Sequence, residues 1–149
     1  NVRSMLCVDV NVLLYAFRQD LAEHEVYAPL LERLANGDES LGIPDLVLSG
    51  FLRIVTNRRV FVEPTAPADA WSFVDDLGRA PAATVLQAGD RHWQHFRRLA
   101  TGIQAVGNDV ADAYLAAYAA ERNATWLSAD RGFARFPDLR WRHPTSLVT

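Results

Sequence analysis

The sequence contains no lysine, because all 15 basic residues of the 149-residue chain are arginine. A P-loop uses a lysine to reach the phosphates of its nucleotide, and a Schiff-base enzyme uses a lysine amine as its nucleophile. Both classes are therefore excluded. The net charge of −3 also shows that the molecule as a whole is not a polycation.

Cysteine and long apolar segments are also scarce. The single cysteine, Cys7, excludes an intramolecular disulfide framework, so we expect a buried thiol in a reducing compartment. No apolar run approaches the roughly 18 residues that a membrane span needs, and the first residues do not have the pattern of a signal peptide. We therefore expect a cytoplasmic protein without a membrane partner.

The length fits a single domain, since domains usually have about 100–200 residues. Half of the residues are hydrophobic and 10% are aromatic, which favours a real core over disorder. Residues 1–4 have the character of a leader or tag remnant, with Met5 as the start. We expect one domain over residues 5–149.

Short apolar runs alternate with segments of helical periodicity along the chain. This alternation is typical of an α/β fold, with a mainly parallel sheet between helices. The predicted strands cover residues 5–10, 40–43, 83–89, 124–128 and 139–142. The predicted helices begin at residue 11 and cover residues 23–37, 45–57, 65–80, 90–102 and 108–122.

Three carboxylates are placed to meet at one edge of that sheet. Asp9 lies near the end of the first strand, Asp130 follows the fourth, and Asp112 lies early in the helix before it. Functional groups collect at the carboxyl ends of parallel strands, and carboxylates held close together need a cation. The pattern predicts a Mg²⁺ or Mn²⁺ site, although Asp130 alone is equally compatible with a turn.

Other polar groups give weaker signals. The four histidines are scattered, and His92 and His95, which share a helix face, have no third ligand at a spacing that zinc would need. Arg53, Arg58 and Arg59 cluster around a helix end, and Arg131 follows Asp130. Guanidinium groups suit phosphate, so these arginines are candidate nucleic-acid contacts, or otherwise ordinary surface residues.

The motifs "VDVNVLLYAF", "VLSGFLRIVTNRRVF" and "DAYLAAYAAERNATWLSADRGFARFPDLRWRHP" resemble those of a PIN-domain ribonuclease of the VapC toxin type. The resemblance runs from Met5 to about Thr145. It implies a central parallel sheet flanked by helices on both faces and Mg²⁺-dependent cleavage of structured RNA, such as tRNA or rRNA. It also implies a VapB-type antitoxin as partner, and a homodimer.

The resemblance assigns roles to individual residues. Asp9, Asp112 and Asp130 match the acids that would bind the metal and carry catalysis, in which a metal-activated water attacks the phosphodiester. Asn11 and Ser128 match supporting positions around these acids.

One position departs from the family pattern. Many PIN toxins have a glutamate where this chain has Gly50. We expect either Asp45 or Asp109 to complete the metal site, and Asp45 is favoured because it also follows a strand end. The departure leaves open whether one or two metal ions bind.

Two alternative functions are compatible with these residues. A PIN fold weakened by Gly50 could serve as an RNA- or protein-binding module. An aspartate-dependent phosphatase or a receiver domain also has an aspartate after its first strand, but such proteins normally need the lysine that this chain lacks.

Overall fold

The computed structural model describes residues 4–148, so residues 1–3 of the expected leader, and Thr149, lie outside the described part. Five parallel strands form one sheet in the order β3-β2-β1-β4-β5. Their bounds are β1 Met5–Val8, β2 Ser40–Pro44, β3 Ala83–Leu86, β4 Thr125–Leu127 and β5 Trp141–Arg142.

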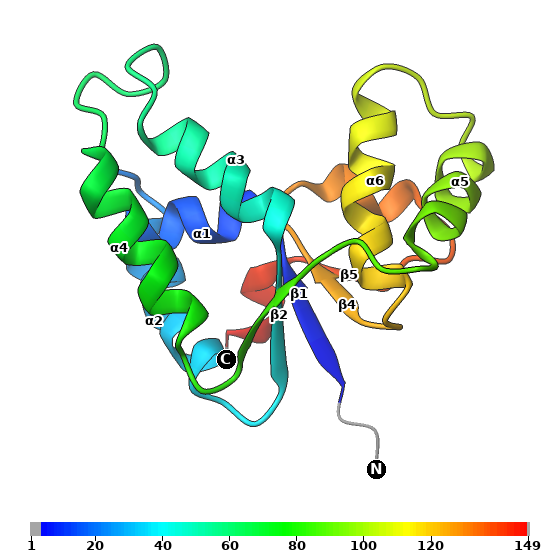
Figure 1. The fold of residues 1–149 in the computed structure, drawn as a ribbon, viewed down its shortest axis with the longest axis horizontal. Helices are drawn as coiled ribbons and strands as arrows, with labels where there is room; N and C mark the ends of the chain where they lie inside the picture. The colour runs from blue at the N-terminus through cyan, green and yellow to red at the C-terminus, as the bar shows by residue number, and fades with distance from the viewer. Residues whose placement is uncertain (1–3, 149) are drawn as a thin grey trace.

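Helices cover both faces of the sheet, which confirms the predicted α/β architecture (Figure 1). One side holds α1 Val10–Phe17, α2 His24–Ala35, α3 Asp45–Val55 and α4 Pro67–Gly78. The other side holds α5 His92–Gly102 and α6 Asn108–Ala120. Two 3₁₀ helices, η1 Arg131–Arg135 and η2 Pro144–Leu147, complete the C-terminal part.

The central position of β1 explains its composition. It pairs with β2 on one side and with β4 on the other, and Cys7 and Val8 are fully buried. A strand covered by helices on both faces has apolar residues at successive positions rather than alternate ones. Because all five strands are parallel, their carboxyl ends meet at one edge of the sheet.

Small residues bring α6 close to the sheet. Four alanines of this helix, Ala113, Ala116, Ala117 and Ala119, are fully buried, and the helix contacts β1 and β4. Gly107 precedes the helix with φ of 58°, a conformation that L-residues with a Cβ rarely adopt. The start of α6, which carries Asp109 and Asp112, is thus fixed next to the carboxyl edge.

The predicted elements all exist, but most are shorter than expected. The first strand ends at Val8, so Asp9 lies outside the strand as the N-cap of α1. The third strand ends at Leu86 instead of residue 89, and the fifth covers only Trp141 and Arg142. Within residues 4–148, no helix is long and apolar enough to cross a membrane.

Candidate active site

Asp9 is the most deeply buried acid at the carboxyl edge, with only 5% of its surface exposed. Its backbone N–H extends the sheet pairing by donating to the Leu127 carbonyl at 3.0 Å. Its Oδ1 accepts a hydrogen bond from the Val10 N–H at 2.7 Å, which caps α1. The strand end and the helix start therefore fix this carboxylate together.

The second carboxylate oxygen of Asp9 is held by Ser128 and Asn11. The Ser128 hydroxyl donates to Oδ2 at 2.7 Å, and the Asn11 amide approaches the same oxygen at 3.4 Å. Asn11 also donates to Ser128 Oγ at 3.0 Å and accepts from the Ala129 N–H at 3.1 Å. This network joins the start of α1 to the end of β4, and it brings together three residues that the sequence placed at the site.

The charge of Asp9 is affected by two distant acids. Burial raises the pKa of the Asp9 carboxyl above its ordinary value, and the hydrogen bonds from Ser128 and Val10 oppose that rise. The negative charges of Asp112 and Asp130 raise this pKa further. Asp112 and Asp130, both predicted from the sequence, thus lie within electrostatic reach of Asp9.

Asp112 and Asp109 share one cation. A single nitrogen of Arg135, Nη2, donates to Asp112 Oδ2 at 3.0 Å and to Asp109 Oδ1 at 2.9 Å. The two acids are three residues apart on α6 and therefore lie on one face of the helix. No local pattern predicts this bridge, since Asp109 and Asp112 lie 26 and 23 residues before Arg135 and belong to a different element.

Asp130 has both a local role and a place at the site. Its Oδ1 accepts from the Gly132 N–H at 2.8 Å and caps η1, as the turn-forming alternative predicts. Its own N–H donates to Ser128 Oγ at 3.1 Å. Ser128 therefore connects Asp130 to Asp9, and the capping role does not exclude a second role for the free oxygen.

Asp45, the favoured replacement for the missing glutamate, has another partner. It is exposed at the start of α3, and its Oδ1 accepts a hydrogen bond from the Tyr118 hydroxyl at 2.9 Å. Asp45 is not among the charges that shift the pKa of Asp9. Asp109 is not among these charges either, but it shares Arg135 with Asp112.

A cavity of about 380 Å³ adjoins Asp9 between α3 and α6. Gly50 lines it, and a Cβ at this position would meet only Val10 Cγ2, at 3.9 Å. The space that a glutamate would fill is therefore open. The other lining residues are mostly apolar, with Ser49, Arg53 and Tyr114 as polar members.

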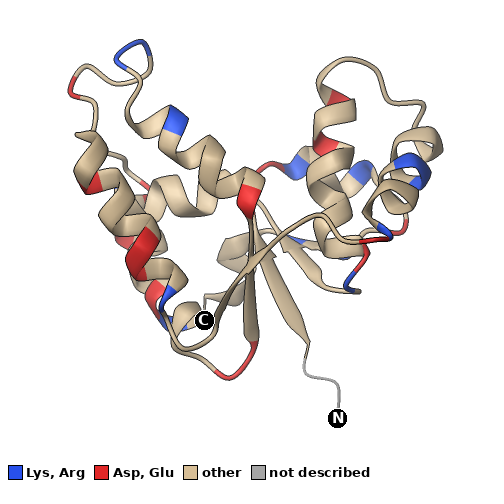
Figure 2. Cartoon of the chain, in the orientation of Figure 1, with Lys and Arg blue, Asp and Glu red and all other residues tan. Residues whose placement is uncertain are grey.

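The candidate RNA-binding arginines lie in different surroundings. Arg53 lines the cavity, whereas Arg58 and Arg59 are exposed in the loop between α3 and α4, whose tip is basic (Figure 2). Arg18 anchors this loop, since it donates to the Glu63 carbonyl at 2.9 Å and lies 3.9 Å from the centroid of the Phe61 ring. Arg131 directly follows Asp130 in sequence, and its positive charge lowers the pKa values of Tyr27 and His143.

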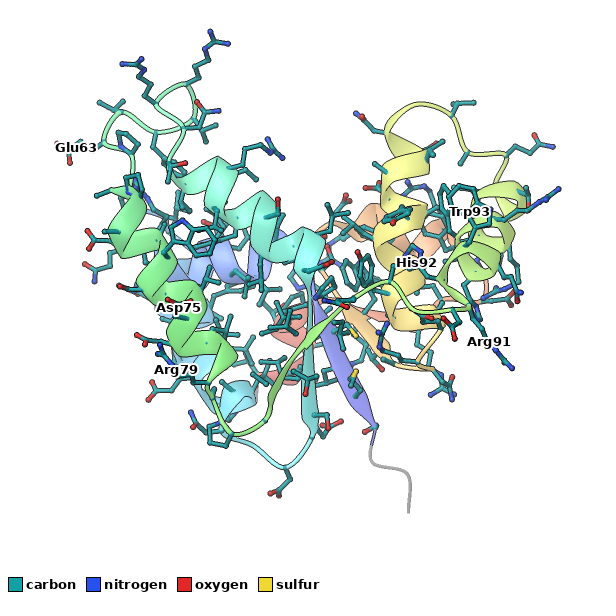
Figure 3. The ribbon with its side chains drawn as sticks, in the orientation of Figure 1. Glu63, Asp75, Arg79, Arg91, His92 and Trp93 are labelled. Atoms are coloured by element: carbon teal, nitrogen blue, oxygen red, sulfur yellow. The ribbon has the colours of Figure 1, made fainter. Side chains whose placement is uncertain are left out.

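The two neighbouring histidines do not form a metal site with each other. His92 is 2% exposed and points toward α6, where its Nε2 lies 2.9 Å from the Tyr114 carbonyl oxygen (Figure 3). Its ring packs edge-on against Tyr114 and Tyr118. The Nδ1 atom of His95 instead lies 3.0 Å from Arg98 Nη2. His92 therefore serves the packing of α5 on α6.

The donor atoms of the site are those that a hard divalent cation prefers, but the acidic side chains are too far apart to bind one ion together. Carboxylate and amide oxygens are the donors that Mg²⁺ and Mn²⁺ prefer, and a buried carboxylate such as Asp9 needs a compensating charge. Within residues 4–148, however, no group of three acidic, histidine or cysteine side chains is close enough to hold an ion. Asp112 faces Arg135 instead of Asp9's hydrogen-bond network.

Comparisons with known proteins agree with this geometry. The family model described as "PIN domain" matches residues 6–139. Ribonuclease VapC43 of Mycobacterium tuberculosis is 70% identical over 140 residues, covering 94% of this chain and 95% of that protein. Ribonuclease VapC25 of the same species is 39% identical, covering 94% and 99%. Among solved structures, VapBC2 from Rickettsia felis, bound to a promoter DNA fragment, matches with a TM-score of 0.70 and 20% identity, covering 93% and 98%.

Proposed function

This chain belongs to the PIN-domain family and to its VapC group, and on that basis we propose that it is a metal-dependent endoribonuclease and the toxin of a toxin–antitoxin pair. The observation that carries the proposal is that Asp9 lies at the carboxyl edge of the sheet within reach of the charges of Asp112 and Asp130. A relative named as a ribonuclease, 70% identical over nearly its whole length, supports the same activity.

The acids at the carboxyl edge would bind the metal, and their hydrogen-bond partners would position them. Asp9, Asp112 and Asp130 would hold Mg²⁺, or Mn²⁺ in its place, and Asp109 would be the additional ligand. A bound Mg²⁺ supplies a more acidic water and neutralises charge on the scissile phosphate. Ser128 and Asn11 keep the Asp9 carboxylate oriented, as their hydrogen bonds to its Oδ2 indicate.

Substrate binding would use the arginines beside the site. Arg53, in the wall of the cavity, is placed to contact a phosphate near the scissile bond. Arg58 and Arg59 would contact the backbone of a folded RNA farther from the site, since they lie on the anchored loop. We propose structured RNA, such as tRNA or rRNA, as the substrate class.

The proposed partners are a VapB-type antitoxin and a second copy of the chain. The solved R. felis structure holds VapBC2 bound to a DNA fragment from its promoter, and the fold of this chain is similar to it. The apolar cavity next to Asp9 offers a place where an antitoxin segment would block access to the acids. A cytoplasmic location would follow from an RNA substrate and a reduced, buried Cys7.

A second candidate function is a PIN fold without catalysis that binds RNA or protein. The open space at Gly50 and the absence of a three-ligand group within residues 4–148 favour it. The phosphatase alternative no longer has support, because the family model that matches is that of a PIN domain.

Cleavage assays on total bacterial tRNA and rRNA would test the proposal. We expect cleavage at defined positions with Mg²⁺, none with EDTA, and none for Asp112→Asn with either. Asp138→Asn is the matched control, because Asp138 is an exposed acid paired with Arg98 outside the site. Full activity of Asp112→Asn would refute the assigned site, and a wild type that binds no Mn²⁺ and cuts nothing would favour the binding module.

Expression in cells gives an independent test of the toxin role. Induction should arrest growth, and co-expression of a neighbouring small reading frame should restore it. Sequencing of the RNA ends that appear soon after induction would identify the target. Unimpeded growth with unchanged RNA would contradict the toxin proposal.

A further inference from the structure

Arg135 is held at the site from two sides. On one side, its Nη2 contacts the carboxylates of Asp109 and Asp112 at 2.9 and 3.0 Å. On the other side, its Nη1 donates to the Gly132 carbonyl, and its guanidinium lies 4.7 Å from the centroid of the Phe136 ring. Phe136 is 1% exposed and therefore fixed. The 3₁₀ helix η1 thus presents the guanidinium to α6 even without the two acids.

The charges at this edge are unbalanced without that arginine. Asp9, Asp109, Asp112 and Asp130 bring four carboxylates into one region, and burial allows little screening around Asp9. Among residues 4–148, Arg135 is the cation that forms ion pairs with members of this set. Both pairs involve the carboxylates on α6, and neither pair includes Asp9.

Arg135 occupies an oxygen of Asp112 that a bound metal ion could also use. Asp112 is the acid on α6 whose charge acts on Asp9, and its Oδ2 is bonded to Arg135. The described residues contain no three-ligand group in this arrangement. A divalent ion that used this oxygen of Asp112 would compete with the guanidinium for it, because both cations are attracted to the same lone pairs.

We propose that Arg135 is an internal counter-cation that competes with the divalent ion for Asp112 and Asp109. This inference rests on the proposed metal-dependent function. Without metal, the arginine neutralises the two acids and keeps α6 joined to η1. When the ion binds, the guanidinium is displaced from the carboxylates but stays beside the site, held by the Gly132 carbonyl and the Phe136 ring. The exchange lowers the apparent metal affinity of the wild type.

The test compares two arginines of the same 3₁₀ helix. Arg135→Gln removes the competing cation, and Arg131→Gln removes an equal charge that acts instead on Tyr27 and His143. Binding of Mn²⁺ is measured from the electron paramagnetic resonance signal of the free ion. Each partly exposed ion pair contributes a factor of roughly two to five, so Arg135→Gln should bind Mn²⁺ about fivefold to twentyfold more tightly than wild type. Arg131→Gln should change the affinity by less than about twofold.

Thermal melting supplies a second measurement that does not depend on activity. In EDTA, Arg135→Gln should melt below Arg131→Gln, because Asp109 and Asp112 then repel each other without a cation. With saturating Mn²⁺ this difference should shrink. Arg135→Lys keeps the charge without the planar fork and should lie between wild type and Arg135→Gln in both measurements.

The outcomes separate this inference from the proposed function. Equal or weaker Mn²⁺ binding by Arg135→Gln, with its fold intact by circular dichroism, would overturn the competition while leaving a metal-dependent nuclease in place. If neither wild type nor Arg135→Gln binds Mn²⁺, both the inference and the metal site fail. Binding by Arg135→Gln alone would support the competition strongly.

Discussion

Replacement of Ser128 by alanine tests whether the buried hydrogen-bond network controls the charged state of Asp9. Ser128 is completely buried, and its hydroxyl takes part in three bonds. It donates to Asp9 Oδ2 at 2.7 Å and accepts from the Asn11 amide at 3.0 Å and from the Asp130 N–H at 3.1 Å. The alanine variant removes all three bonds and adds no bulk.

The expected loss of stability follows from these partners. A hydrogen bond to a charged group contributes about 1.5–3 kcal/mol. The Asn11 amide still lies 3.4 Å from Asp9 Oδ2, and the exposed Asp130 can bond to water instead, so the other two bonds add little. We expect a loss of about 2–3 kcal/mol in the free energy of unfolding at pH 7. For a domain of this size, that corresponds to a fall in Tm of roughly 5–10 °C.

The loss should depend on pH in a defined direction. Burial raises the pKa of Asp9 above that of an unfolded aspartate, about 3.9, so the folded state binds its proton more tightly. The contribution of Asp9 to stability is therefore fully present below about pH 3.9 and is lost as the pH rises through the raised pKa. Because Ser128 stabilises the ionised form, the difference between wild type and Ser128→Ala should be largest at neutral pH and shrink toward acid.

Urea unfolding in EDTA from pH 4.5 to pH 7.5 measures this difference. Ser72→Ala, at an exposed position of α4, is the control and should change stability by less than about 0.5 kcal/mol. In an Asp9→Asn background, the cost of Ser128→Ala should fall by about 1.5 kcal/mol or more. A loss that is independent of pH, or unchanged in the Asp9→Asn background, would refute the claim that Ser128 acts through the charge of Asp9.

Three further outcomes are expected. Gly50→Glu should tighten Mn²⁺ binding by about tenfold, because the open space beside Asp9 admits a carboxylate. Gly50→Gln, which adds no charge, should leave the affinity unchanged. Equal effects of the two variants in a Mn²⁺ titration would contradict this. Asp45→Asn should leave Mn²⁺ affinity within about twofold, because its carboxylate is bonded to Tyr118, and a tenfold weakening would make Asp45 a ligand after all. Gly42→Ala should cost about 1–3 kcal/mol in urea unfolding, because its Cβ would lie 2.7 Å from Leu86 Cδ1 and 2.9 Å from Met5 Sδ; a neutral variant would show that these two side chains can shift freely.

The loop between α3 and α4 illustrates a limit of sequence patterns. Arg58 and Arg59 follow Arg53 after only four intervening residues, and the sequence analysis grouped all three as one patch. In the structure, Arg53 lines the cavity at Asp9, whereas the other two belong to a loop held in place by Arg18. Contacts between Arg18 and residues more than 40 positions away could not be inferred from local spacing.

The sequence by itself determined the sheet, its helices and the three acids at its edge. Hydrophobic runs and helical periodicity report burial and local geometry directly, and parallel strands necessarily end at one edge. Asp9, Asp112 and Asp130 were placed there for this reason. The third strand was predicted too long, because residues 87–89 leave the sheet for a loop whose Gly89 N–H donates to Glu121, the C-cap residue of α6.

Only the tertiary structure decided how each acid is paired. Asp9 is held by Ser128 and Asn11, Asp112 and Asp109 by Arg135, and Asp45 by Tyr118. Side-chain pairing depends on distances between elements to within about 1 Å, and a hydrogen bond is lost beyond about 3.5 Å. Periodicity along the chain contains no information at that precision, so the bond between Asp45 and Tyr118 and the bridge from Arg135 to Asp109 and Asp112 became visible only in three dimensions.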